Sequence, residues 1–194
     1  MDPQIALLLT YMLLALVVSA LCSFLEATIL STPMSYVTTL EAQGVKGWQR
    51  LKQYKTNIDR PISAILIVNT IANTVGASLV GSQAAGYAAK HYSTSDETSL
   101  FVGVVSAVFT LLVLIFSEIF PKTVATAYWR RFAIPASSAI RVYIMLTYGL
   151  VVLLEKMTRS VSSNSTQESV TRDEVAAIVT VGTQEGVLEK KENR

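Results

Sequence analysis

Three long stretches without a charged side chain constrain this sequence more than any other feature. They cover residues 3–25, 61–89 and about 98–117. A helix needs about 20 mainly apolar residues to cross a bilayer, and each stretch has that length. Charged residues make up 15% of the 194-residue chain and hydrophobic residues 51%, whereas soluble domains carry roughly 25% charge. The pattern predicts an all-α membrane protein with three transmembrane helices per subunit.

The segment between the first two predicted spans, residues 31–60, is predicted to lie on the cytoplasmic side. Its basic side chains outnumber its acidic ones, with Lys46, Arg50, Lys52, Lys55 and Arg60 against Glu41 and Asp59. By the positive-inside rule the N-terminus is then outside. Apolar residues spaced by three on either side of Gly44 predict two short amphipathic helices. Ser31-Thr32-Pro33 has the form of a helix start.

The third span is predicted to run from about residue 98 to Glu118. Basic residues after Pro121 mark the following segment as cytoplasmic: Lys122, Arg130, Arg131 and Arg141. The next apolar stretch, residues 142–154, is too short for an upright span and is expected to lie along the membrane as a belt helix. A tilted fourth span is the alternative. The three-span reading places the C-terminus in the cytoplasm of a multi-pass cell-membrane protein.

The remaining sequence predicts a division into three parts. Residues 1–159 form the transmembrane domain with its juxtamembrane helix, and the serine-rich residues 160–169 form a linker. Residues 170–194 begin a cytosolic helical bundle, with Thr171 and Glu174 at capping positions. The chain ends at Arg194 in a charged run, so we expect it to be part of a longer protein.

Polar side chains inside the predicted spans are the main functional signal. The third span contains a carboxylate, Glu118, and an ionisable group at membrane depth is by default a functional-site hypothesis. The other spans also carry polar groups: Ser19, Ser23 and Glu26 in the first, and Asn69, Asn73 and Ser78 in the second. Counted from the cytoplasmic ends at about 1.5 Å per residue, Ser23, the asparagines and Glu118 lie at similar depths. We expect these groups to share one layer.

Hydroxyl, amide and carboxylate oxygens without His or Cys suit a hard cation, and this chemistry leaves Mg²⁺, Ca²⁺ and Na⁺ open. The alternative is that the serines and asparagines only form hydrogen bonds between helices, which is common in membranes. Ser78 comes five residues after Asn73, so it joins the layer only if the second span is broken near Gly76. Such a break would free backbone carbonyl groups as ligands.

Several functions are disfavoured. The net charge of +2 is too small to predict nucleic-acid binding. The single cysteine, Cys22, offers no disulfide framework, and the single histidine, His91, lies in a polar loop outside the spans. Nucleophilic catalysis at membrane depth needs a base such as histidine, so an intramembrane hydrolase is not predicted, and we expect no enzyme.

The motifs resemble the CNNM/CorC (cyclin M-like) magnesium transporter family. The similarity lies in residues 19–30, Ile-Val-Asn-Thr-Ile-Ala-Asn at 67–73, Ser-Glu-Ile-Phe-Pro-Lys-Thr at 117–123 and Gly-Val-Leu-Glu at 186–189. The asparagine-rich and Glu-Ile-x-Pro-Lys motifs are specific in combination. Ser117 stands where the family often has glycine, and Leu25-Glu26-Ala27-Thr28 replaces the common Ser-Glu-Thr-Ala.

The resemblance implies a homodimer of three-span subunits that transports Mg²⁺, with export driven by Na⁺ entry. It implies Mg²⁺ ligands at Ser19, Ser23, Asn73, Ser78 and Glu118 and at a backbone carbonyl near Gly76, with Asn69 and Glu26 in supporting positions. It also implies a following CBS module that binds ATP. The alternative function is a cation-sensing or scaffolding membrane protein with a structural ion site.

Overall fold

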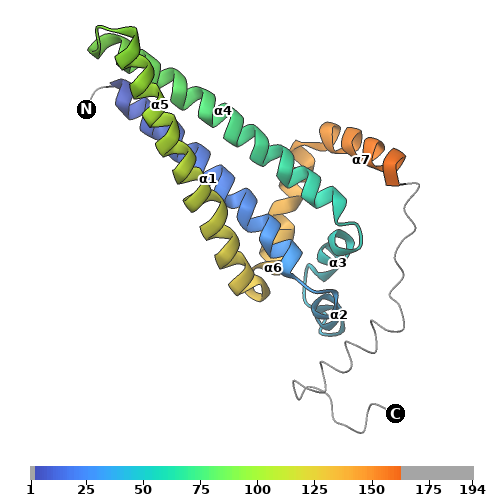
Figure 1. The fold of residues 1–194 in the computed structure, drawn as a ribbon. Helices are drawn as coiled ribbons and strands as arrows, with labels where there is room; N and C mark the ends of the chain where they lie inside the picture. Colours follow the sequence, from blue (N-terminus) through green and yellow to red (C-terminus); the bar gives the residue numbers. More distant parts are fainter. Residues whose placement is uncertain (1–2, 163–194) are drawn as a thin grey trace, which may run out of the picture. The chain divides into compact units, whose positions relative to one another are not determined.

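The computed structural model describes residues 3–162, and all of its regular elements in that range are helices. They are α1 (Pro3–Ser31), α2 (Met34–Ala42), α3 (Trp48–Thr56), α4 (Asp59–His91), α5 (Ser95–Leu112), the π-helical segment η1 (Val113–Ile119), α6 (Phe120–Leu146) and α7 (Tyr148–Ser162) (Figure 1). Contacts divide the chain into two units, Met1–Glu155 and Lys156–Arg194, and the long helices all lie in the first.

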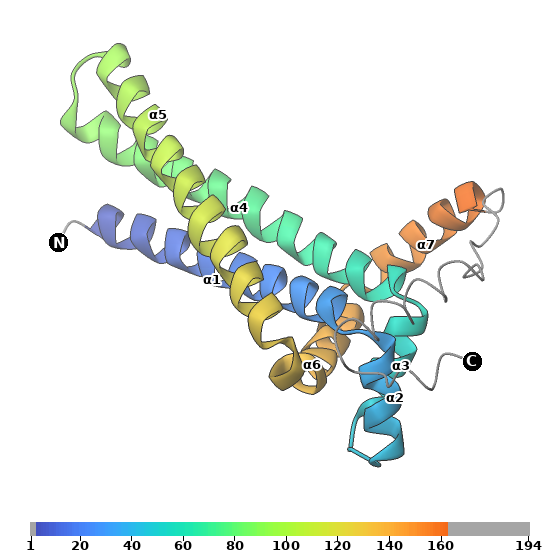
Figure 2. The ribbon, with the colours of Figure 1, turned by 60° about the horizontal axis from the view of Figure 1, so that its bottom comes forward.

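The predicted membrane class is confirmed. Among the described residues, three helical stretches are long and apolar enough to cross a bilayer: Pro3–Ser31, Asp59–His91 and Ser95–Leu146. The first span, α1, packs against α4, η1 and α6, and α4 packs in turn against α5 and α6 (Figures 1 and 2). The first span is therefore the element that holds the other two together.

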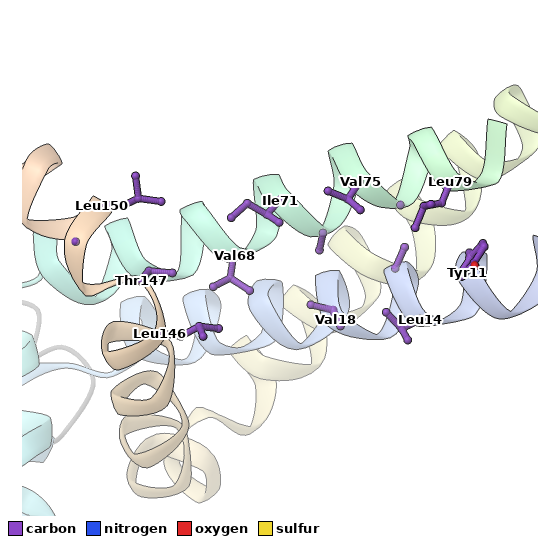
Figure 3. A pocket seen from close by; sticks show the side chains of 14 residues that line it. Tyr11, Leu14, Val18, Val68, Ile71, Val75, Leu79, Leu146, Thr147 and Leu150 are labelled. Carbon is purple, nitrogen blue, oxygen red and sulfur yellow. The ribbon is translucent and has the colours of Figure 1, made fainter. Parts of the chain in front are cut away.

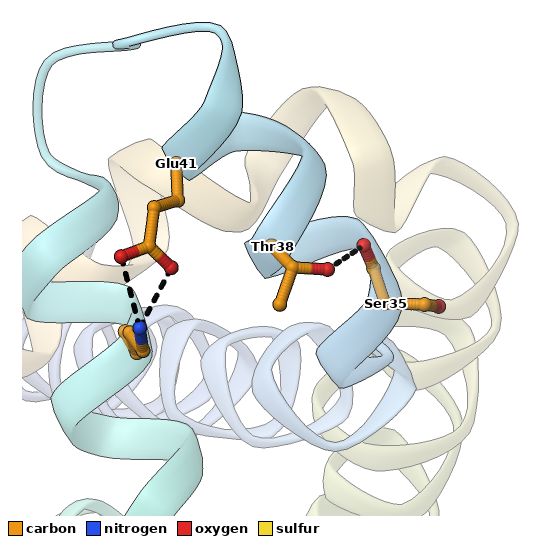
Figure 4. Close-up of polar contacts among 4 residues, drawn as sticks. Ser35, Thr38 and Glu41 are labelled. Carbon is orange, nitrogen blue, oxygen red and sulfur yellow. Dashed lines mark hydrogen bonds and ion pairs between the residues drawn. The ribbon is translucent and has the colours of Figure 1, made fainter.

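The two short helices predicted between the first two spans are present as α2 and α3. Val37 and Leu40 of α2 and Leu51 and Tyr54 of α3 are buried in one apolar cluster with residues of α1, α4 and α6. A salt bridge of 2.7 Å between Lys52 and Glu41 joins the two helices (Figure 4). The predicted helix start is displaced, however. Ser31 still belongs to α1, and Pro33 is the residue that precedes α2.

A lysine from α3 ties these short helices to the first span. The last turn of α1 contains no basic residue, but Lys55 Nζ donates a hydrogen bond to the carbonyl oxygen of Ile29 at 3.1 Å. A cation is favourable there because the C-terminal end of a helix carries partial negative charge. Burial lowers the pKa of Lys55. The contact replaces a cap that the local sequence of α1 does not provide.

The third span is not a regular α-helix throughout. Its middle is the π-helical segment η1, and the backbone N–H of Phe120 bonds to the carbonyl oxygen of Ile115, five residues back. The segment ends two residues before Pro121, whose ring would clash with the carbonyl group four residues earlier in a regular α-helix. The helix then continues past the predicted end of the span as α6 and changes direction at Tyr128, where φ is −116° and ψ is 20°.

The apolar stretch 142–154 does not form the single belt helix that we predicted. It is divided between α6, which ends at Leu146, and α7, which begins at Tyr148. Thr147 separates them with φ −104° and ψ 15°, and its hydroxyl donates to the carbonyl oxygen of Tyr143 at 2.7 Å. Continuous helicity through the stretch is lost at this residue. Residues 160–162 of the predicted linker are helical. The rest of the linker and the predicted cytosolic bundle, with Thr171 and Glu174, lie outside the described residues.

The break near Gly76 that Ser78 would need to join the layer is not present in this structure, where α4 runs as one helix from Asp59 to His91. Gly76 lies where α1 and α4 approach closely. A Cβ atom added there would overlap the Cβ of Ala15, and it would lie 3.8 Å from Cζ of Phe109. The absence of a side chain therefore serves close packing, a common use of glycine between membrane helices.

Replacing Gly76 with alanine should lower the melting temperature of the detergent-solubilised protein, because α1 and α4 must separate to admit the new Cβ. Overpacking of this kind costs about 1–3 kcal/mol. Gly81→Ala is the matched control, since it lies on the same helix with nothing within 4 Å of an added Cβ. Because alanine has a higher helix propensity than glycine, Gly81→Ala should leave the stability of the protein unchanged or raise it by up to ~1 kcal/mol. Equal melting temperatures for the two variants would contradict the close approach.

Candidate functional site

Polar side chains of three helices lie around two hydrogen bonds that join the spans near their middle. They come from α1, α4 and η1, and we call them the polar layer: Ser19, Ser23, Asn69, Asn73, Ser117 and Glu118. The three serines are almost completely buried, with exposed fractions of 0% for Ser19, 1% for Ser23 and 0% for Ser117. Asn69, Asn73 and Glu118 are half-buried.

Two hydrogen bonds between helices set the depth of this layer. The Ser19 hydroxyl donates to Asn69 Oδ1 at 2.8 Å and joins α1 to α4. The Ser117 hydroxyl donates to the carbonyl oxygen of Leu16 at 2.9 Å and joins η1 to α1. Leu16 is three residues before Ser19, and Glu118 directly follows Ser117. The bonds therefore bring all three spans to one level, as the depths counted from the sequence predict.

Two buried oxygen atoms in the layer have no hydrogen-bond partner among the described residues: Ser23 Oγ and Asn73 Oδ1. Leaving a buried polar group unsatisfied costs about 1–3 kcal/mol. Ser23 has an alternative, because a helical hydroxyl can bond to the carbonyl group four residues earlier. Thr28, Thr32, Ser78 and Thr123 all do so, but Ser23 does not. Unpaired acceptor oxygens of this kind fit a cation.

Glu118 supplies the negative charge of the layer. Among the residues that the structure describes, it forms no hydrogen bond or ion pair with another side chain. The described part of the chain also contains no group of three or more His, Cys, Asp or Glu side chains that could hold a metal ion. The available ligands are therefore one carboxylate with neutral hydroxyl and amide oxygens, which favours a hard cation over Zn²⁺ or Cu⁺.

Three of the residues predicted for the site lie elsewhere in this arrangement. Ser78 is exposed and its hydroxyl bonds within α4, to the carbonyl oxygen of Thr74 at 2.9 Å. Gly76 is buried against Ala15 within a continuous helix. Glu26 forms an ion pair with Lys122, with 3.2 Å between Lys122 Nζ and Glu26 Oε2. Ser78 and the Gly76 carbonyl can join the layer only if α4 unwinds.

Sequence reasoning missed two structural roles. Ser117 was noted only as a departure from the family pattern, yet it anchors the third span to α1. Lys122 belongs to a sequence motif and marks the cytoplasmic side, and in the structure it also pairs with Glu26. No local spacing signals this pair, because the two residues lie far apart in the sequence.

A separate groove of about 530 Å³ lies between α1, α4 and the α6–α7 junction, and its lining is almost entirely apolar (Figure 3). Its labelled side chains include Val18 of α1, Ile71 and Val75 of α4, and Leu146 and Thr147. None of the six residues of the polar layer lines it. The polar layer and this groove are therefore different features, although both involve α1 and α4.

The fold and the polar layer define a class: a helical membrane protein whose spans bring together oxygen ligands suited to a hard cation. Comparison with known families agrees. The chain belongs to the CNNM family, because the model of the cyclin M transmembrane N-terminal domain matches residues 10–192. The family resemblance drawn from the sequence motifs is thus confirmed.

Curated relatives extend the comparison across bacteria. The UPF0053 protein sll1254 of Synechocystis sp. is 30% identical over 91% of this chain. A UPF0053 protein of Haemophilus influenzae is 29% identical over 77% of it, and the UPF0053 inner membrane protein YfjD of Escherichia coli is 32% identical over 60%. The matches cover 48%, 33% and 25% of these relatives. The chain therefore spans less than half the length of each.

Alanine at Ser23 and at Ser19 should affect folding in opposite ways. Ser23→Ala removes an unsatisfied hydroxyl, so Mg²⁺-free stability should stay equal or rise by about 1 kcal/mol. Ser19→Ala removes the hydrogen-bond donor of Asn69 Oδ1 and should lower the stability of the protein by about 1–2 kcal/mol. Melting temperatures in detergent with a chelator present measure both effects. A loss of stability in Ser23→Ala as large as that in Ser19→Ala would show that Ser23 has a structural partner.

Proposed function

We propose that this domain transports Mg²⁺ across the cell membrane, as an exporter driven by Na⁺ entry, through the polar layer between α1, α4 and η1. The observation that carries the proposal is the set of unpaired oxygens: Ser23 Oγ, Asn73 Oδ1 and the Glu118 carboxylate. Family membership supports transport of a divalent cation. The direction and the coupling to Na⁺ rest on the family resemblance alone.

Each residue of the layer has a proposed part in holding the ion. Glu118, Ser23 and Asn73 offer their free oxygens directly. Ser19 donates its proton to Asn69, so the lone pairs of its hydroxyl oxygen remain available to a cation. Asn69 thus positions Ser19 rather than binding the ion itself. Gly76 and Ser78 contribute only in a state in which α4 unwinds.

A single carboxylate suits a site that must release its ion. Mg²⁺ requires near-octahedral geometry and dehydrates reluctantly, so a cage of several carboxylates would hold it too strongly for turnover. The π-helical turn places Glu118 on a segment with irregular hydrogen bonding, and such turns are frequent at functional sites. A change between π- and α-helical register there would rotate Glu118 relative to α1 and α4. We propose this rotation as the motion that exposes the ion.

The longer protein is proposed to form a homodimer and to carry an ATP-binding CBS module after this domain. The relatives are at least twice as long as the part that this chain matches, which leaves room for such a module. The N-terminus is proposed to lie outside and the C-terminus in the cytoplasm, on the basis of the positive-inside rule.

Glu118→Gln should abolish Mg²⁺ transport while the protein still folds, because a neutral amide cannot replace the charge of the layer. The loss of one charged ligand should weaken Mg²⁺ binding at least about 100-fold, roughly 3 kcal/mol. Mg²⁺ flux is measured in sealed proteoliposomes with an imposed Na⁺ gradient, and binding is measured by calorimetry in detergent. Glu41→Gln is the control, because this carboxylate is paired with Lys52 between α2 and α3.

Three outcomes separate the alternatives. Wild-type flux in Glu118→Gln would overturn the assigned site. Mg²⁺ binding without flux in the wild-type protein would identify a sensor or scaffold with a structural ion. Flux that is independent of the Na⁺ gradient would remove Na⁺ coupling and leave Mg²⁺ transport in place.

A further inference from the structure

We propose that Lys122 exchanges its ion-pair partner between Glu26 and Glu118, and so neutralises Glu118 whenever Mg²⁺ leaves the polar layer. This inference rests on the proposed function, because it assigns a regulator to the same site. It gives a role to the salt bridge between α1 and α6, which the ligand set does not use.

The first partner is established by the geometry. Lys122 Nζ lies 3.2 Å from Glu26 Oε2, and the exposed fractions of the two side chains are 43% and 31%. Glu26 lies three residues beyond Ser23 on α1, so it occupies the same helix face about one turn from the layer. The pair therefore adjoins the polar layer without entering it.

The second partner is within reach on the lysine's own helix. Lys122 follows Glu118 by four residues, and side chains at this spacing are neighbours on an α-helix. The helix is α-helical from Phe120 onward, and the hydroxyl of Thr123 bonds to the carbonyl oxygen of Ile119 at 2.8 Å. Glu118 is the second-last residue of η1, directly before this α-helical turn. We infer that rotation about the bonds of the flexible lysine side chain moves its ammonium group from one carboxylate to the other.

Charge balance gives the exchange its direction. With Mg²⁺ bound, Glu118 is occupied by the ion. Repulsion between Mg²⁺ and the ammonium group of Lys122 then favours the pairing of Lys122 with Glu26. Without Mg²⁺, Glu118 would be an uncompensated charge in a half-buried layer, which is costly. Glu26 can lose its partner more cheaply, because its side chain is 31% exposed and it lies nearer the predicted cytoplasmic end of α1. Lys122 thus competes with Mg²⁺ for Glu118, and Glu26 restrains that competition.

The exchange predicts opposite effects for the two members of one salt bridge. Lys122→Met removes the competitor and should raise Mg²⁺ affinity about 10-fold, within the usual range of coupling between linked sites. Glu26→Gln leaves Lys122 with only Glu118 and should lower Mg²⁺ affinity about 10-fold. The double variant should behave like Lys122→Met, because the effect of Glu26 acts through the lysine.

A double-mutant cycle of Mg²⁺ binding by calorimetry in detergent tests this epistasis. If Lys122 and Glu26 act only as fixed charges, their effects on Mg²⁺ affinity add and cancel in the double variant. A double variant close to wild-type affinity would therefore overturn the exchange. Equal losses of affinity in both single variants would indicate a purely structural salt bridge and would also overturn it. Lys122→Arg keeps the charge and should stay near wild-type affinity, and Lys122→Gln replaces Lys122→Met if that variant does not fold.

Two further measurements separate this inference from the proposed function. Lys52→Met breaks the comparable Lys52–Glu41 pair away from the layer and should leave Mg²⁺ affinity unchanged. Glu118→Gln should abolish binding. If Glu118→Gln binds Mg²⁺ normally, the proposed site itself is wrong. If it does not bind but the cycle is additive, only the lysine exchange is wrong.

Discussion

The contact between α1 and α4 is the interaction on which the rest of this structure depends. Lipid tails are as apolar as leucine, so membrane helices gain no hydrophobic stabilisation from pairing and associate through close packing and hydrogen bonds. Both are present on one face of α1. Ala15 packs against Gly76, and one turn further Ser19 bonds to Asn69. On the same two helices, Ser23 Oγ and Asn73 Oδ1 are buried without a hydrogen-bond partner among the described residues.

The third span completes the layer through a different constraint. Pro121 cannot be accommodated in an unperturbed α-helix, and the preceding residues form a π-helical turn that contains Ser117 and Glu118. Ser117 bonds this turn to the backbone of α1 at Leu16, and the carboxylate of Glu118 directly follows it. The irregular turn and the ionisable residue thus coincide, and a local backbone adjustment is sufficient to reposition the charge.

Hydroxyl groups in the spans fall into two kinds, and this difference carries the functional argument. Thr10, Thr110 and Ser78 bond to carbonyl groups of their own helices, which lets a polar side chain exist in an apolar helix without a partner elsewhere. Ser19 and Ser117 bond to other helices, and Ser23 bonds to nothing described. A serine in a membrane helix therefore signals a site only when its own helix does not satisfy it. The amino-acid sequence does not distinguish the two cases.

The sequence alone determined the three spans and the two short helices after the first, and it predicted similar depths for Ser23, the asparagines and Glu118. These follow from lengths and periodicities, which are local properties of the chain. Only the tertiary structure decided that Gly76 packs against Ala15, that the helix irregularity includes Glu118, and that Ser78 lies away from the layer. It also divided the apolar stretch 142–154 at Thr147. Each of these depends on which helix face meets a neighbour, and that choice is made by contacts between residues far apart in the sequence.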